Sequence, residues 1–161
     1  MQIAVIGAAD ATPEEAAAAY AVGSLIAGAG ATLICGGLGG VMEAASRGAQ
    51  EAGGTTVGIV PDTGHGNRYL DIVIRSGLGH ARNVLVSQSA DAVITIGGSY
   101  GTLSEIAIAV KTGRPVFGLS SWDIPGVIPC ATPEEAVGMA ARAARNSVAP
   151  KRQKKGRSRE P

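Results

Sequence analysis

The sequence predicts a single α/β domain of three layers, in which a mostly parallel sheet of five to seven strands lies between helices on both faces. Short β-rich runs alternate along the chain with alanine-rich stretches, which is typical of this class. The 161 residues suffice for one globular domain but not for two ordinary ones. Hydrophobic residues make up 45% of the chain and charged residues 17%, so a core can be buried.

Each expected strand is a short, continuous apolar run, as strands covered on both faces should be. The runs are Gln2 to Ile6, Thr32 to Cys35, Thr56 to Val60, Ala92 to Ile96 and Val116 to Leu119, with Val127 to Ile128 as a further candidate. Because parallel strands need crossover connections, we expect helices in the gaps between them.

Two helix starts are marked by capping boxes. The segments Thr12-Pro13-Glu14-Glu15 and Thr132-Pro133-Glu134-Glu135 each place Thr at the N-cap, Pro at the first helical position and Glu three residues after the cap. We therefore expect helices from about Pro13 and Pro133. Three more are expected over residues 40–52, 81–89 and 102–112.

Two stretches do not fit this alternation. Residues 61–80 are rich in Gly and Pro and are expected to form a long loop, which is often functional.

The second stretch is the end of the chain, where the charge changes sign. The formal net charge of +1 is a sum of two unlike parts, since residues 1–150 carry 8 basic and 12 acidic side chains and residues 151–161 carry 6 basic and 1 acidic. We expect a domain at residues 1–145 and a disordered basic tail at residues 146–161, which favours at most a weak contact with nucleic acid.

Composition disfavours several kinds of protein. Aromatic residues make up only 3% of the chain, too few for a platform that stacks single-stranded nucleic acid. Cys35 and Cys130 belong to no CxxC or Cys/His cluster, which favours buried thiols over a disulfide, and no metal site is expected. The first basic residue is Arg47 and no apolar run approaches about 18 residues, so we expect a cytoplasmic protein without a membrane span.

Glycine is the compositional outlier, with 24 residues, and two dense clusters follow predicted strands. One is Gly36-Gly37-Leu38-Gly39-Gly40 and the other is Gly97-Gly98-Ser99-Tyr100-Gly101-Thr102. In open parallel sheets, ligands bind beyond the carboxyl ends of strands, where glycine turns and helix N-termini present N–H groups to anions. The clusters are therefore predicted to cradle a phosphate; the alternative is that they only permit tight turns.

Neither cluster is a standard nucleotide fingerprint. The third glycine of GxGxxG is missing and Gly-Lys-Ser/Thr occurs nowhere, which disfavours a dinucleotide redox cofactor and excludes a P-loop NTPase. Residues 97–101 satisfy GxSxG, but a hydrolase triad of that kind needs a downstream histidine, and both His65 and His80 lie upstream of Ser99. Ser99 is therefore interpreted as an anion-contacting or turn residue.

Two charged residues near the clusters each have two interpretations. Thr102 and Glu105 have capping-box spacing, in which the carboxylate only accepts a backbone N–H. The alternative is that Glu105, beside a phosphate cradle, stabilises a sugar oxocarbenium ion or binds sugar hydroxyls. Arg82 is either a solvated surface charge or a bidentate phosphate ligand. Spacing alone favours the cap and the surface charge.

Four motifs occur in order along the chain: Gly36-Gly37-x-Gly39-Gly40-Val41-Met42-Glu43-Ala44, Gly53-Gly54-x-x-Val57-Gly58-Ile59-Val60-Pro61, Ala81-Arg82-Asn83 and Gly97-Gly98-x-x-Gly101-Thr102-x-x-Glu105. Together they resemble the LOG-like superfamily, once mislabelled as lysine decarboxylases, over about residues 1–145. Residues 77–83 most resemble the branch that contains the molybdenum cofactor carrier proteins. The resemblance implies a Rossmann-like fold, a homodimer or homotetramer, and a phosphorylated nucleotide-like ligand.

The resemblance also implies roles for individual residues. In the LOG enzymes, phosphoribohydrolases that release a free base from a nucleoside 5′-monophosphate, the catalytic pair matches Arg82 and Glu105. The implied ligand-binding residues are Gly36, Gly37, Gly39, Gly40, Met42, Asn83, Gly97, Gly98, Ser99, Tyr100, Gly101 and Thr102.

Two departures from the LOG pattern favour binding over catalysis. Ile96 stands where the LOG motif has Pro, and Asn83 stands where Lys commonly follows the Arg. We therefore expect a carrier of a nucleotide monophosphate or of the molybdenum cofactor, with no other cofactor required. The alternative is a phosphoribohydrolase. A decarboxylase is disfavoured because Lys111 is the only lysine before the tail.

Overall fold

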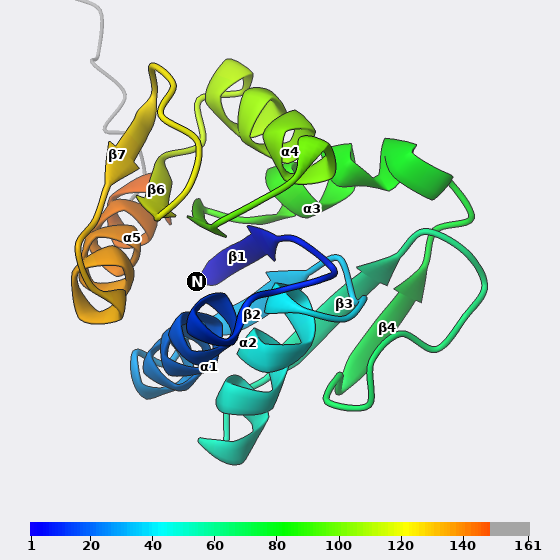
Figure 1. Cartoon of the computed structure of the whole chain (residues 1–161). Coiled ribbons are helices and arrows are strands. Elements are labelled where there is room, and N and C mark those ends of the chain that lie inside the picture. Colours follow the sequence, from blue (N-terminus) through cyan, green and yellow to red (C-terminus); the bar gives the residue numbers. More distant parts are fainter. Residues whose placement is uncertain (149–161) are drawn as a thin grey trace, which may run out of the picture.

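The computed structural model describes residues 1–148 and confirms the three-layer α/β class (Figure 1). Seven strands form one sheet in the order β4-β3-β2-β1-β5-β6-β7, and every neighbouring pair is parallel. The strands are β1 (Gln2–Gly7), β2 (Thr32–Cys35), β3 (Thr56–Val60), β4 (Ile72–Arg75), β5 (Ala92–Ile96), β6 (Val116–Leu119) and β7 (Val127–Pro129).

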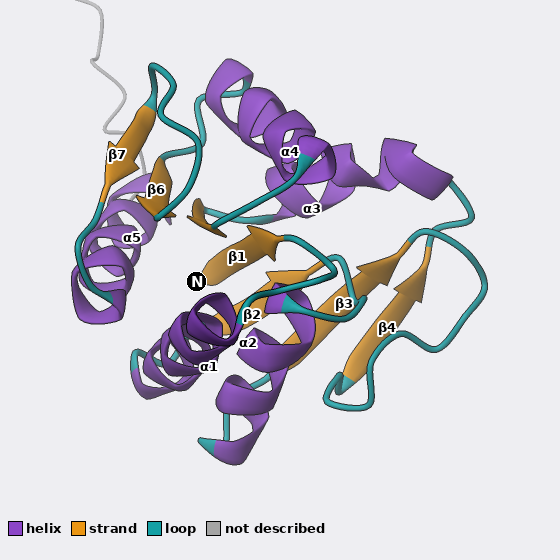
Figure 2. Ribbon diagram, in the orientation of Figure 1, coloured by secondary structure: helices purple, strands orange, loops and turns teal. Residues whose placement is uncertain are grey.

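Helices cover both faces of this sheet (Figures 1 and 2). One face carries α1 (Pro13–Gly28), α2 (Val41–Glu51) and α5 (Pro133–Val148); the other carries the short 3-10 helix η1 (Gly79–Arg82), α3 (Asn83–Ser89) and α4 (Tyr100–Lys111). The alternation of β1 supplies both cores, because Ile3 and Val5 pack on the α1 side while Ala4 and Ile6 pack on the α3 side. β1 is therefore the buried centre of the molecule.

The six strands expected from the apolar runs are confirmed to within one residue. The expectation of an unbroken loop over residues 61–80 was wrong, because β4 lies within it and pairs with β3, with Ile72 aligned to Val57. Three apolar residues in a glycine-rich stretch do not by themselves indicate a strand. They form one because they pair with the open edge of β3. Ile72 and Ile74 remain 50% and 46% exposed.

The capping box of α1 is confirmed in both directions. The Thr12 N–H donates to the Glu15 carboxylate over 2.9 Å, and the Glu15 N–H donates to the Thr12 hydroxyl over 3.2 Å. In α5 the Glu135 N–H likewise donates to the Thr132 hydroxyl, but the Glu135 carboxylate accepts from Ala131. Both helices begin at the proline, as their spacing predicts.

Three other boundaries differ from the expected ones. The helix expected from residue 102 begins at Tyr100, and the helix expected over residues 81–89 is divided into η1 and α3. Helix α5 continues to Val148, three residues past the expected end of the domain at residue 145. The rest of the expected tail, residues 149–161, lies outside the described residues. Among residues 1–148, no helix combines the length and apolarity needed to cross a membrane.

Candidate functional site

The strand order brings the two glycine turns to one edge of the sheet. The turn after β2 (residues 36–40) and the turn after β5 (residues 97–101) flank the end of β1 on either side, because β1 lies between β2 and β5 (Figure 2). The strand order also reverses at β1, and ligands of open α/β sheets bind at such a point. This edge is therefore the candidate site.

Arg82 and Glu105 form a buried ion pair beneath this edge. Arg82 Nη1 donates to Glu105 Oε1 over 3.0 Å, and each residue is only 6% exposed. The interpretation of Arg82 as a solvated surface charge was therefore wrong. The capping interpretation of Glu105 was also wrong, because α4 begins at Tyr100 with Ser99 as its N-cap, and the Thr102 hydroxyl accepts the Ser99 N–H.

Burial sets the protonation of this pair. Desolvation raises the pKa of Glu105 from 4.5 to about 7, although the charge of Arg82 and its hydrogen bond act to lower that pKa. Near neutral pH the carboxyl group can therefore hold or lose a proton. Perturbed carboxyl groups of this kind are common at functional sites.

Gly36 provides the space in which Arg82 lies. A Cβ atom at Gly36 would stand only 2.5 Å from Arg82 Nη1, so a side chain there would displace the guanidinium. The Nε–H of Arg82 is buried and finds no acceptor among residues 1–148. A buried unpaired donor costs free energy, so this position of the guanidinium is not explained by its protein contacts alone.

Hydrogen bonds hold the turn after β2 on both sides. The Val41 N–H donates to the Ala8 carbonyl, while Asn67 donates to the carbonyl groups of Gly37 (2.8 Å) and Leu38 (3.0 Å). The Gly37 N–H donates to the Cys35 thiol. Two more expected site residues lie nearby. A Cβ atom at Gly39 would lie 3.4 Å from the Ala9 carbonyl oxygen and 3.9 Å from the Glu43 carboxylate. The Met42 side chain is buried in the core on the α1 side. This turn is fixed in shape by its neighbours.

The turn after β5 is more open. The Gly97 N–H donates to the Leu119 carbonyl, and the Gly97 carbonyl accepts from the Ser121 hydroxyl over 2.7 Å. By contrast, the N–H groups of Gly98, Tyr100 and Gly101 find no acceptor within residues 1–148, and Tyr100 is 84% exposed. The first turn of α4 therefore presents free N–H donors and the positive end of the helix dipole to a ligand.

Asn83 connects the buried pair to this open turn. Its amide Nδ2 donates to the Ser104 hydroxyl over 2.8 Å and lies 3.5 Å from the Gly101 carbonyl. Ser104 in turn donates to Gly101 over 2.7 Å. Asn83 thus fixes η1 and α3 against the first turn of α4, a positioning role for the residue that departs from the LOG pattern.

Sequence reasoning missed two polar residues at this edge. Glu15 was identified only as a capping residue, yet its carboxylate also lies against the Cα of Gly97. Asn67 had no recognisable signal, because it lies in the glycine-rich stretch before β4 and reaches the turn after β2 only in the folded chain. Their positions depend on which loops the sheet brings together.

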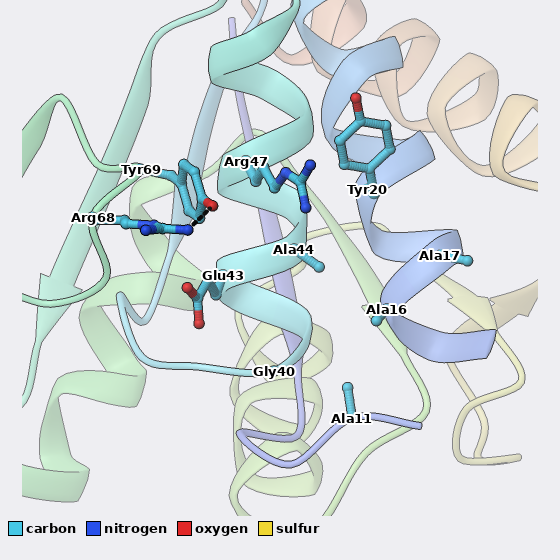
Figure 3. A pocket seen from close by; sticks show the side chains of 10 residues that line it. All are labelled: Ala11, Ala16, Ala17, Tyr20, Gly40, Glu43, Ala44, Arg47, Arg68 and Tyr69. Carbon is cyan, nitrogen blue, oxygen red and sulfur yellow. Dashed lines mark hydrogen bonds between the residues drawn. The ribbon is translucent and has the colours of Figure 1, made fainter. Parts of the chain in front are cut away.

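A wider hollow lies elsewhere on the described structure (Figure 3). It measures about 670 Å³ and runs along α2, between α1 and residues 68–69. Arg47 pairs with Glu51, which also accepts from the Tyr20 hydroxyl, and Arg68 donates to the Tyr69 hydroxyl. Its polar groups largely satisfy one another, and Gly40 is the one predicted site residue that lines it.

Cys35 contributes to this edge as the acceptor of the Gly37 N–H. Both thiols are free; Cys35 is buried and Cys130 is half-buried. Burial raises the pKa of the Cys35 thiol, which keeps it protonated. Within residues 1–148, His, Cys, Asp and Glu form no group of three or more suited to a metal ion.

Comparisons with known proteins agree with the motifs. Residues 1–150 match the sequence model of the SLOG cluster4 family. A protein of uncharacterised function from Archaeoglobus fulgidus is 51% identical over 139 residues, which cover 85% of this chain and 92% of that protein.

Two solved structures share the fold closely. The molybdenum cofactor binding protein of Rippkaea orientalis has a TM-score of 0.80 and 39% identity, over 86% of this chain and 93% of that one. The molybdenum cofactor carrier protein of Chlamydomonas reinhardtii has a TM-score of 0.81 and 34% identity, over 88% and 97%. The resemblance inferred from the motifs is confirmed, and the chain belongs to the SLOG cluster4 family.

Proposed function

We propose that this protein binds and carries a phosphorylated, nucleotide-like small molecule at the ends of β2 and β5. A molybdopterin-type cofactor is the first candidate, because two solved relatives are named for binding or carrying the molybdenum cofactor. A nucleoside monophosphate is the second. The observation that carries the proposal is the set of free N–H groups at the first turn of α4, beside a buried arginine with an unpaired Nε–H.

The residues at this edge suit the phosphate of such a ligand. The N–H groups of Gly98, Tyr100 and Gly101 supply backbone donors, and the dipole of α4 favours negative charge at the same place. Arg82 adds a guanidinium beneath the turn, held by Glu105. Because the domain is acidic as a whole, the attraction for an anion has to be local.

The direct test is native mass spectrometry of the purified protein, followed by thermal unfolding with molybdenum cofactor, AMP and GMP. We expect a retained cofactor, or a higher Tm with at least one of these ligands; saturation at about 100 times Kd stabilises by about 2.7 kcal/mol. If no ligand is retained and none raises the Tm, the carrier proposal fails.

A charge variant locates the phosphate. Gly101→Asp places a carboxylate in the first turn of α4, where acidic residues stabilise a helix, so the fold should survive while phosphate binding is lost. Ala107→Asp adds the same charge at an exposed position further along α4 and should bind normally. Equal affinity in the two variants would place the phosphate elsewhere.

The buried Arg82–Glu105 pair supports a second candidate function, the phosphoribohydrolase. Both residues match the catalytic pair of the LOG enzymes, and a carboxylate near a sugar could stabilise a developing oxocarbenium ion. Incubation with AMP and other nucleoside monophosphates, followed by chromatography for free base, separates the candidates. Turnover that Glu105→Gln abolishes would overturn the carrier proposal in favour of the hydrolase.

We also propose that the protein is a homodimer or homotetramer. Five apolar side chains between β4 and α3 are a third to a half exposed, next to the segment that carries Arg82; they are Ile72, Ile74, Leu78, Val84 and Leu85. A second copy would cover them. Sedimentation should give a multiple of 16.0 kDa for the wild type and a smaller species for Leu85→Glu. A monomeric wild type would overturn this proposal.

A further inference from the structure

A second, smaller hollow adjoins the open turn after β5. It measures about 300 Å³ and is lined by Glu15, Gly97, Gly98, Ser120, Ser121 and Trp122. That volume is at the lower end for ligand pockets and suits one fused ring system, not a whole nucleotide. A ligand whose phosphate lies on the first turn of α4 would have its remaining part within reach of this hollow.

Glu15 brings one unused carboxylate oxygen to the hollow. Its Oε2 accepts the N–H of Thr12 over 2.9 Å as part of the helix cap. Its Oε1 lies against the Cα of Gly97 and accepts no hydrogen bond from any residue among 1–148. The cap therefore holds the side chain in place while the free oxygen remains a charged acceptor, which pairs best with N–H donors.

The indole of Trp122 lines this hollow, and the ring of Tyr100 lies beside the indole. The rings of Tyr100 and Trp122 lie 6.3 Å apart at 37°, so the indole supports the otherwise exposed tyrosine. The indole N–H of Trp122 is buried and has no acceptor in the described chain. Aromatic faces of this kind stack on planar heterocycles.

The loop that carries Trp122 is held in shape before any ligand binds. Ser121 donates to the Gly97 carbonyl over 2.7 Å and shares a hydrogen bond of 2.8 Å with Thr95. Ser120 has a φ of 46°, the one positive value for a non-glycine residue in the described chain. Such a strained conformation persists only where the surroundings enforce it, often at ligand sites.

From these contacts we infer that the hollow receives the ring of the bound ligand and selects a 2-amino-4-oxopyrimidine edge, as in guanine or a pterin. That edge offers a ring N–H beside an exocyclic amino group, and both are donors for the free oxygen of Glu15. Adenine lacks the ring N–H. The inference rests on the proposed function, because the phosphate on α4 brings the ring to the hollow.

The test compares GMP, AMP and ribose 5-phosphate on the full chain by calorimetry and by tryptophan fluorescence. Trp122 is the only tryptophan of the chain, so its emission reports on the hollow directly. We expect GMP to bind about tenfold or more tightly than AMP, the discrimination typical of a good hydrogen-bonded base edge. GMP should also change the indole emission, whereas ribose 5-phosphate should bind without that change.

A matched pair of variants tests the role of Glu15. Glu15→Gln keeps an oxygen that can accept the Thr12 N–H, so α1 remains capped, but it removes the charge. We expect this variant to bind GMP about tenfold more weakly and AMP with unchanged affinity. Glu135→Gln is the control, because Glu135 has the equivalent capping position in α5 and is not among the residues that line the hollow.

The outcomes separate this inference from the proposed function. Equal binding of GMP and AMP, or an equal loss of both in Glu15→Gln, overturns the ring selection while phosphate binding stands. If ribose 5-phosphate, GMP and AMP all fail to bind, the phosphate site fails as well and both proposals are overturned.

Discussion

The turn after β2 and the turn after β5 have similar glycine-rich sequences but different surroundings. The first is held by Ala8 and Asn67, and Gly36 lies directly on the buried guanidinium of Arg82. The second leaves the N–H groups of Gly98, Tyr100 and Gly101 free. The difference indicates that glycine at the first turn serves close packing, whereas glycine at the second keeps backbone donors accessible.

The largest expected effect is at the first turn. Arg82→Met removes the only cation paired with buried Glu105 among residues 1–148, and should lower the free energy of unfolding by about 3–5 kcal/mol at pH 8. The loss should be smaller at pH 5, because Glu105 can then take up a proton. Urea unfolding measures both values. Arg142→Met, at an exposed position of α5, is the control and should change little.

A pair of glycine substitutions compares the turns directly. Gly40 has a φ of 60°, and a Cβ there would overlap the carbonyl oxygens of Ala8 and Ala9, so Gly40→Ala should cost about 3 kcal/mol. At Gly101 the nearest atom to a new Cβ is Ser99 Oγ at 3.9 Å, so Gly101→Ala should be neutral or slightly stabilising. If Gly101→Ala is the more damaging change in urea unfolding, our contrast between the turns is wrong.

The ionisation of Glu105 predicts that the free energy of unfolding depends on pH. We expect no such dependence from the turn after β5. The folded carboxyl group has a pKa of about 7 and the unfolded one about 4.5, so the folded state binds more protons between these values. The free energy of unfolding should therefore fall as the pH rises, by about 2 kcal/mol from pH 5 to pH 8. Glu105→Gln should flatten this profile; an unchanged slope would show that another group titrates.

The smallest expected effect concerns the basic residues at 151–161. Deleting residues 149–161 should change the affinity of AMP or GMP by less than about twofold in 0.15 M salt, because salt at that concentration screens charges beyond about 8 Å and the proposed site consists of residues within 1–148. Calorimetry on the full and shortened chains measures this. A large loss would mean that these residues take part in the site, and the contrast between the two turns would then be incomplete.

Consecutive residues were enough to predict most elements. The prolines and glutamates of the two Thr-Pro-Glu-Glu segments predicted the starts of α1 and α5, and the apolar runs predicted six strands. β4 was missed because its strand character depends on the free edge of β3. The start of α4 was misplaced because Thr102-x-x-Glu105 matches a capping box as well as Ser99 does, and only the folded helix distinguishes them.

The candidate site was likewise predicted in part from consecutive residues and in part not. Gly36 to Gly40, Gly97 to Thr102, Arg82 and Glu105 were all recognisable as motifs before the fold was known. The contacts among these residues could not be predicted from the motifs. The motifs did not show that Arg82 lies against Gly36 or that Glu15 lies against Gly97. Nor did they show that Asn83 links α3 to α4. Each of these contacts joins residues on different elements.

By itself, the sequence determined the α/β class, the family motifs and the two glycine turns, because periodicity, capping and turn chemistry are properties of neighbouring residues. Only the tertiary structure decided which turn is closed and which is open. It also decided that Arg82 and Glu105 form an ion pair, so that Arg82 is not a surface charge and Glu105 is not a helix cap. The reason is that burial and pairing depend on the strand order, which brings distant segments to one edge of the sheet.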